Sequence, residues 1–229
     1  MFRHFAHGPA NASVRRTKLA NAVTRSVDAV EAARTGEKSM SRSQANGKRS
    51  TVTLHVVSSL DGFIAKNDNS VSWLDSSGDV YEGGVSEGSA EDAIKAIDCF
   101  VLGSRTYEHA LQLGWPYGET PTVVVTNREL PSTRKSVEFY SGDLKRLVDE
   151  ILAPRYGSIW LVGGAMLCQS FLRLGLVGEI RLSIAPVLLG DGLRLFGDSS
   201  TETRWHLKDV VAYKTGFVEL LYGSKSTNS

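Results

Sequence analysis

Short hydrophobic stretches recur along the chain, and most are followed by a turn or by a helical pattern. Over residues 51–57 apolar positions alternate with others, so that Val52, Leu54 and Val56 share one face. This spacing predicts a first β-strand with one face in the core. Fully buried strands are predicted by three runs that are almost entirely apolar, at 99–102, 122–125 and 159–162.

Helical patterns separate most of these strands. Near the end of the chain, apolar and polar residues alternate again. A short strand is predicted at 137–140. The alternation of strands and helices predicts an α/β fold, in which helices flank a mainly parallel central sheet and antiparallel strands form its C-terminal edge. The predicted helices cover 90–96, 107–113, 143–152 and 165–174, and the late strands cover 179–185, 205–211 and 217–222.

The N-terminal 49 residues differ in composition from the rest. They hold ten Lys and Arg against three Asp and Glu, and they contain no strand-like run. We expect a basic, disordered extension at 1–49, with an organelle transit peptide or sequence upstream of the true start as alternatives. One domain is expected at 50–224, followed by a short tail at 225–229, because about 180 residues can bury roughly 70% of their unfolded surface.

Charge and cysteine content limit the classes of function that the sequence supports. The part of the chain after residue 49 carries 16 basic and 22 acidic side chains, which argues against general nucleic-acid binding. Cys99 and Cys168 lie in apolar surroundings and are expected to be reduced core residues. No Cys and His spacing is typical of zinc, and no apolar run is long enough to span a membrane. We therefore expect a cytoplasmic protein without a metal site.

Three of the predicted buried strands end in segments suited to an anion. Ser158-Ile-Trp-Leu-Val-Gly-Gly-Ala-Met-Leu167 runs from a strand through two glycines into a helix, whose free N–H groups favour a phosphate. The same glycines could serve close packing alone. Because the carboxyl ends of parallel strands meet at one edge, these segments together predict a nucleotide site. The other two segments are Gly103, Ser104, Arg105 and Thr106, and Thr126, Asn127 and Arg128.

Five motifs in a fixed order resemble the reductase domain of bacterial riboflavin biosynthesis, a relative of dihydrofolate reductase. The resemblance covers about residues 51–223 and implies a dihydrofolate reductase-like fold. The motifs are Ser59-Leu-Asp-Gly-Phe-Ile-Ala65, Val101-Leu-Gly-Ser-Arg-Thr-Tyr-Glu108, Val123-Val-Val-Thr-Asn-Arg128, Val162-Gly-Gly-Ala165 and Pro186-Val-Leu-Leu-Gly-Asp-Gly192.

The resemblance implies NADPH as the cofactor and assigns each motif to a part of it. The family pattern Gly-Arg-x-Thr has Ser104 in place of its Arg here, which leaves open whether Arg105 substitutes for that phosphate contact. The implied contacts are Gly103, Ser104, Arg105 and Thr106 with the phosphates, Thr126, Asn127 and Arg128 with the adenosine ribose and its 2′-phosphate, Val162, Gly163, Gly164, Ala165 and Met166 with the pyrophosphate, and Leu60, Asp61 and Gly62 with the nicotinamide.

Candidate catalytic and substrate-binding residues are few. Asp61 is the one ionisable residue in the motif that the resemblance places at the nicotinamide, so it is the candidate proton donor. An Asp before a Gly also forms turns, and that role is the alternative. Trp73 either lines the site of a flat substrate or packs in the core. His55 lies on the strand face opposite Leu54, and we expect a structural role for it.

The expected function is NADPH-dependent reduction of a small heterocycle, with homodimerisation implied by the resemblance. The resemblance favours a 5-amino-6-(5-phosphoribosylamino)uracil reductase-like activity. A dihydrofolate reductase-like pterin reductase and a non-catalytic nucleotide-binding protein of the same fold are the alternatives. The zinc deaminase motifs that often accompany this reductase are absent from the sequence.

Overall fold

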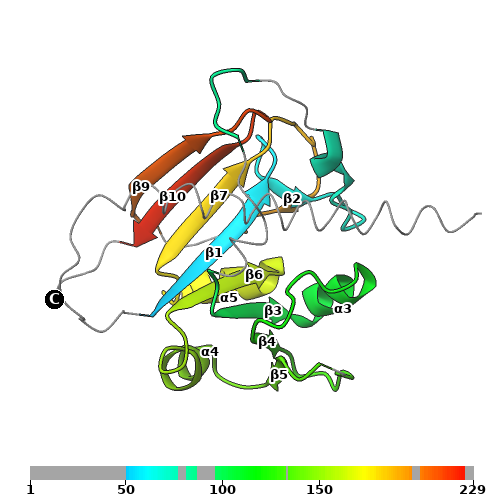
Figure 1. The fold of residues 1–229 in the computed structure, drawn as a ribbon, viewed down its shortest axis with the longest axis vertical. Helices are drawn as coiled ribbons and strands as arrows, with labels where there is room; N and C mark the ends of the chain where they lie inside the picture. Colours follow the sequence, from blue (N-terminus) through cyan, green and yellow to red (C-terminus); the bar gives the residue numbers. More distant parts are fainter. Residues whose placement is uncertain (1–49, 77–80, 87–95, 133, 198–201, 225–229) are drawn as a thin grey trace, which may run out of the picture.

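A computed structural model describes residues 50–76, 81–86, 96–132, 134–197 and 202–224. The basic extension at 1–49, the tail at 225–229 and all but the last residue of the helix predicted at 90–96 lie outside these ranges, and those expectations stay predictions. In the described part, one large β-sheet forms the centre of the fold (Figure 1).

The large sheet has eight strands in the order β5-β4-β3-β6-β1-β7-β10-β9. The six strands from β5 to β7 run parallel, and β10 and β9 follow in antiparallel pairing, as the sequence predicts. In chain order the strands are β1 Thr51–Ser58, β3 Cys99–Gly103, β4 Thr122–Val125, β5 Val137–Tyr140, β6 Ser158–Gly163, β7 Glu179–Ile184, β9 Trp205–Ala212 and β10 Val218–Ser224.

Helices lie on both sides of the parallel part of the sheet. Helix α3, Ser104–Gln112, follows β3 directly, and α5, Ala165–Arg173, follows β6 after one residue. The predicted helix at 143–152 is a short α-helix, α4 Leu144–Arg146, which continues as the π-helical segment η3, Leu147–Leu152. Each of these helices connects two parallel strands, which explains the sequence alternation of strand and helix.

The core has two main parts, one on each face of the sheet. On one face Leu54 of β1 and Leu161 of β6 pack with Phe171 of α5. On the other face Phe100 of β3 and Trp160 of β6 pack with Tyr107 of α3. Because side chains alternate along a strand, neighbouring residues such as Trp160 and Leu161 serve opposite faces. This explains why the predicted buried strands are apolar at nearly every position.

A second, two-stranded sheet was not predicted. It pairs β2, Phe63–Ala65, with β8, Leu193–Arg194, in antiparallel orientation. The loop between β1 and β2 thereby comes to lie beside the segment after β7. A short 3₁₀ helix, η2 Ser72–Ser76, follows β2.

Candidate functional site

Four neighbouring parallel strands end at the same edge of the large sheet. They are β4, β3, β6 and β1, which are adjacent in this order (Figure 1). Register pairs Gly103 at the end of β3 with Val125 at the end of β4, and Leu102 with Gly163 at the end of β6. The four segments that the sequence singled out therefore come together at this edge. They are 126–128, 103–106, 163–166 and 60–62.

Glycines let the ends of β3 and β6 approach closely. A Cβ atom added at Gly103 would lie 3.6 Å from the backbone nitrogen of Gly164 and 3.7 Å from the carbonyl oxygen of Gly163. A Cβ atom at Gly164 would lie 3.5 Å from Oγ1 of Thr106. Gly163 has φ +132°, and its peptide bond to Gly164 is cis. Bare backbone thus forms the surface between the two strand ends, where a ligand can lie against main-chain groups.

The helices that follow these strands begin without side-chain caps. Gly103 is the N-cap of α3 and Gly164 the N-cap of α5, and neither helix has a capping side chain. By contrast, Asp143 caps α4 by accepting a 2.8 Å hydrogen bond from the backbone N–H of Arg146. The first N–H groups of α3 and α5 thus have no side-chain acceptor of the kind that usually satisfies them, and such groups bind anions.

Arg128, after β4, forms a two-pronged ion pair with Glu108 of α3. Its Nη1 lies 3.0 Å from Oε2 of Glu108 and its Nη2 lies 2.6 Å from Oε1. The hydrogen bond from Arg128, and then its charge, lower the pKa of Glu108, and the charge of Arg105 adds to this. Both side chains of the pair are exposed, at 55% for Arg128 and 39% for Glu108. Arg128 is a residue predicted from the sequence, whereas its pairing with Glu108 is not.

Thr126 and Asn127 hold the turn that carries Arg128. The hydroxyl oxygen of Thr126 accepts a 3.0 Å hydrogen bond from the backbone N–H of Arg128. The side-chain oxygen of Asn127 accepts a 2.6 Å hydrogen bond from the hydroxyl of Ser141. These contacts fix the backbone of the turn and leave the guanidinium accessible to solvent.

Asp61 ties the loop after β1 to the loop after β7. Its carboxylate accepts hydrogen bonds from the backbone N–H groups of Leu189, at 3.1 Å, and Gly190, at 2.7 Å, and from the hydroxyl of Ser59. The Ser59 bond, followed by the backbone bonds, lowers the pKa of Asp61 to about 2. A carboxyl group with this pKa holds no proton near neutral pH. These contacts favour the turn-forming role over the role of proton donor.

Several apolar side chains beside the site edge are exposed. Leu60 is 61% exposed and Met166 is 79% exposed, although both are apolar. Leu188, in the loop that Asp61 anchors, is also exposed. Exposed apolar side chains next to uncapped helix N-termini form a surface that suits the flat apolar faces and anionic groups of a nucleotide.

Trp73 of η2 is buried. It packs with Leu74, Tyr213 and Phe217 in a small apolar cluster at the turn between β9 and β10. This position favours the core interpretation of Trp73 over a place on a substrate-binding surface.

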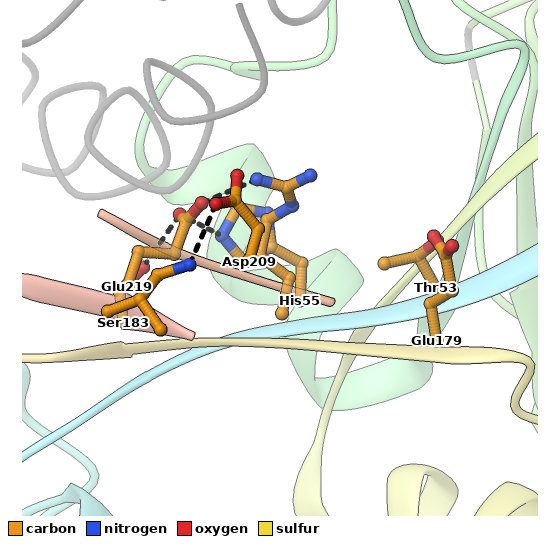
Figure 2. Close-up of polar contacts among 8 residues, drawn as sticks. Thr53, His55, Glu179, Ser183, Asp209 and Glu219 are labelled. Atoms are coloured by element: carbon orange, nitrogen blue, oxygen red, sulfur yellow. Dashed lines mark hydrogen bonds and ion pairs between the residues drawn. The ribbon is translucent and has the colours of Figure 1, made fainter. Parts of the chain in front are cut away.

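A second group of polar residues is buried in the sheet, on strands β1, β7 and β10. Glu219 of β10 accepts a 2.5 Å hydrogen bond from Arg181 of β7 and a 3.3 Å hydrogen bond from the hydroxyl of Ser183 (Figure 2). His55 of β1 lies nearby and stacks on Trp160 at a ring distance of 4.7 Å. These contacts agree with the structural role that we expect for His55.

His55 and Glu219 do not form an ion pair near neutral pH. Nε2 of His55 lies 3.8 Å from the carboxylate of Glu219, which is too long for a hydrogen bond. Burial, and then the charge of Arg181, lower the pKa of His55 well below its usual value, so the imidazole is neutral. Burial raises the pKa of Glu219 while Arg181 opposes this. We take Arg181 and Glu219 as the charged pair of this group.

The described residues contain neither a cluster suited to a metal ion nor a helix suited to a membrane. No group of three His, Cys, Asp or Glu side chains among them is arranged to hold a metal ion. Nor does this part of the chain contain a helix with the length and apolar content that crossing a membrane requires. Cys99 and Cys168 are both buried and free, and burial raises the pKa of each thiol to about 12, as expected for core cysteines.

Comparison with known proteins places these features in a family. A family model described as the RibD C-terminal domain matches residues 50–218. The uncharacterized protein YwjB of Bacillus subtilis is 32% identical over 163 residues, which cover 70% of this chain and 90% of YwjB.

Two solved structures share the fold at low sequence identity. One is a diaminohydroxyphosphoribosylaminopyrimidine deaminase/5-amino-6-(5-phosphoribosylamino)uracil reductase from Thermotoga maritima, with a TM-score of 0.54 and 17% identity over 77% of this chain and 57% of that one. The other is a dihydrofolate reductase from Enterococcus faecalis in complex with NADP(H), with a TM-score of 0.51 and 13% identity over 77% and 97% of the two chains. These likenesses confirm the dihydrofolate reductase-like fold.

Proposed function

This chain belongs to the RibD C-terminal domain family, and on that premise we propose that it is an NADPH-dependent reductase of a small heterocyclic substrate. The observation that carries the proposal is the edge where β4, β3, β6 and β1 end together. Bare glycine backbone and two uncapped helix N-termini lie at that edge. In parallel sheets such an edge is the usual place for a nucleotide.

The described residues fit a dinucleotide with three phosphate groups. The N-termini of α3 and α5 would bind the pyrophosphate through backbone N–H groups, and an added Cβ at Gly103 would fill part of that surface. Thr126, Asn127 and Arg128 would meet the adenosine ribose and its 2′-phosphate. Leu60 and the loop that Asp61 anchors would border the nicotinamide. NADPH, when bound, supplies the hydride, and the protein supplies position and exclusion of water.

The proposed substrate is the ribosylamino-pyrimidine of riboflavin biosynthesis. Support comes from the family and from the uracil reductase named in the Thermotoga protein. A pterin is the second candidate, because the Enterococcus protein of the same fold is a dihydrofolate reductase. A non-catalytic nucleotide-binding protein is the third, because Ser104 replaces a family Arg and Asp61 holds no proton near neutral pH.

The test is selective cofactor binding. Fluorescence titration measures the affinities of NADPH and NADH for the wild type and for Arg128→Ala. Loss of one charged hydrogen-bonded contact to the 2′-phosphate should weaken NADPH by about 10- to 100-fold and leave NADH nearly unchanged. Arg155→Ala is a matched control, because Arg155 forms the same two-pronged ion pair with Glu138 and precedes β6 instead of following a strand. It should change neither affinity.

The outcomes separate the candidates. Selective NADPH binding that Arg128→Ala abolishes would support the proposed site and lead to assays of NADPH oxidation with the pyrimidine and with dihydrofolate. Binding without oxidation of NADPH by either substrate would favour the non-catalytic protein. If neither nucleotide binds, the proposal is wrong.

We also propose that the protein is a cytoplasmic homodimer. Leu207 and Val210 of the outer strand β9 are exposed and apolar, which is a feature of surfaces between subunits. Size-exclusion chromatography with light scattering tests the assembly, and a mass near that of one chain, 24.9 kDa, would exclude the dimer.

A further inference from the structure

We propose that Glu108 competes with the 2′-phosphate of the cofactor for Arg128 and thereby limits how strongly the site prefers NADPH to NADH. The inference rests on the proposed function and adds a specificity-determining residue to it. Glu108 comes from α3 and Arg128 from the turn after β4, so the two strand ends that border the adenosine site are joined by this pair.

The competition follows from the geometry of the guanidinium group. Arginine presents its N–H donors in a planar fork that matches either a carboxylate or a phosphate. Glu108 takes donors from both Nη1 and Nη2 of Arg128, at 3.0 and 2.6 Å. A phosphate that approaches the same fork must displace the carboxylate or share the fork with it.

Electrostatics adds a second cost to NADPH binding. The hydrogen bond from Arg128 lowers the pKa of Glu108, so the carboxylate is charged throughout the neutral range. A charged carboxylate repels the negative charge of the 2′-phosphate at short range. NADH carries a hydroxyl in place of that phosphate, so it binds without separating Glu108 from Arg128.

The position of the pair distinguishes it from an ordinary surface ion pair. Glu108 lies one turn along α3 from Ser104, at the helix whose N-terminus belongs to the candidate site. Glu138 and Arg155 have the same two-pronged contact, at 3.0 and 2.8 Å, and comparable exposure. Glu138 lies on β5, and Arg155 lies before β6. This second pair is therefore outside the proposed 2′-phosphate site, and it serves as the control.

The experiment measures NADPH and NADH affinities by fluorescence titration for the full chain. The variants are Glu108→Gln, Arg128→Ala, the double variant and Glu138→Gln. Glutamine keeps the size of Glu108 and one acceptor oxygen but removes the charge. We expect Glu108→Gln to strengthen NADPH binding by about two- to fivefold, the range that exposed ion pairs support, and to leave NADH unchanged. In the double variant the gain should shrink, because its competitive part acts through Arg128 and only the direct repulsion of the phosphate by Glu108 remains to be relieved.

The results separate this inference from the proposed function. Selective NADPH binding by the wild type with unchanged or weaker binding by Glu108→Gln overturns the inference alone, and weaker binding would show that Glu108 orients Arg128. An equal gain in Glu138→Gln would also overturn it, since the effect would then be one of net charge. Absence of NADPH binding in the wild type and in Glu108→Gln overturns both. Thermal unfolding of each variant checks that the fold is unchanged.

Discussion

Asp61 and Gly190 are 129 positions apart in the sequence and are joined by a 2.7 Å hydrogen bond from the backbone N–H of Gly190 to the carboxylate of Asp61. The N–H of Leu189 adds a second donor to the same carboxylate. One side chain therefore joins the loop after β1 to the loop after β7, beside the 2.8 Å backbone hydrogen bond from the N–H of Leu60 to the carbonyl oxygen of Val187. This contact supports the position of Leu60 at the candidate nicotinamide site.

We predict that Asp61→Asn makes the stability of the protein less dependent on pH in the acid range. The pKa of Asp61 is about 2 in the fold and about 3.8 without these contacts. A carboxyl group with a depressed pKa contributes stability that is complete above its unfolded pKa and is lost as the pH falls through its folded pKa. The contribution of Asp61 should therefore decline from about pH 4 to about pH 2.

Thermal unfolding of the wild type and Asp61→Asn between pH 2 and pH 7 measures this difference. Their melting temperatures should differ above pH 4 and converge toward pH 2. Parallel curves would show that the charge of Asp61 does not hold the two loops. A pH-activity profile adds a second check, because activity that needs a protonated Asp61 would fall as the pH rises through its pKa, and this fall would be absent in the variant.

Gly103→Ala and Gly163→Ala should differ in what they change, the first weakening nucleotide binding and the second lowering stability. At Gly103 a Cβ atom has room, with its nearest neighbour at 3.6 Å, so we expect little change in stability. Its methyl group should weaken NADPH and NADH alike, because it fills the surface proposed for the phosphates. At Gly163 the φ of +132° suits glycine alone, and alanine should destabilise the fold by about 1–3 kcal/mol.

Denaturant unfolding and nucleotide titration of both glycine variants provide the measurements. Unchanged nucleotide affinity in Gly103→Ala would show that the cofactor does not bind at the end of β3. An unchanged free energy of unfolding in Gly163→Ala would contradict the role of backbone conformation there.

Loss of Arg181 should destabilise the protein far more than loss of an exposed charge. The Arg181 and Glu219 side chains are 10% and 2% exposed, and removing the cation leaves a buried carboxylate without its main partner. We expect Arg181→Met to lower the free energy of unfolding by about 3–5 kcal/mol at neutral pH. Arg181→Met combined with Glu219→Gln should recover part of this loss, because the uncompensated charge is gone.

The pH dependence of Arg181→Met gives an independent check by denaturant unfolding. Burial raises the pKa of Glu219, and without Arg181 only the hydrogen bond from Ser183 opposes the rise. A carboxyl group whose pKa is raised is tolerated best when protonated, so the deficit of Arg181→Met should shrink as the pH falls. If the loss of unfolding free energy is the same at every pH, its cause is lost packing and not the charge of Glu219.

The sequence predicted the parts of this fold that depend on local patterns. Alternation and apolar runs located the strands of the large sheet, and glycines located the turns at the ends of β3 and β6. The two-stranded sheet was missed because β8 has only two residues, Leu193 and Arg194, which is too short for a periodic signal. Helix α4 and the π-helical segment η3 were predicted as one continuous helix, since their inward apolar spacing is nearly the same.

The parts of the candidate site that could not be predicted from the sequence depend on contacts between residues far apart in the chain. Arg128 was recognised from its motif, but its pairing with Glu108 depends on how α3 packs beside β4. Asp61 had two interpretations, and the donors at Leu189 and Gly190 that distinguish them lie 128 and 129 residues away. The sequence motif at 186–192 contains both donors, but nothing in the sequence indicates that they bind Asp61.

The order of strands in the sheet also bears on how the chain is made. β1 lies between β6 and β7, and its residue His55 pairs with Arg181, which the ribosome adds more than 100 residues later. Neither neighbour of β1 exists while the first half of the domain emerges, so β1 must remain without its sheet partners during that time. Such long-range parallel pairing slows folding and exposes strand edges. A nascent chain that stops before β7 would therefore present β1 with at least one open edge, as a substrate for chaperones or for aggregation.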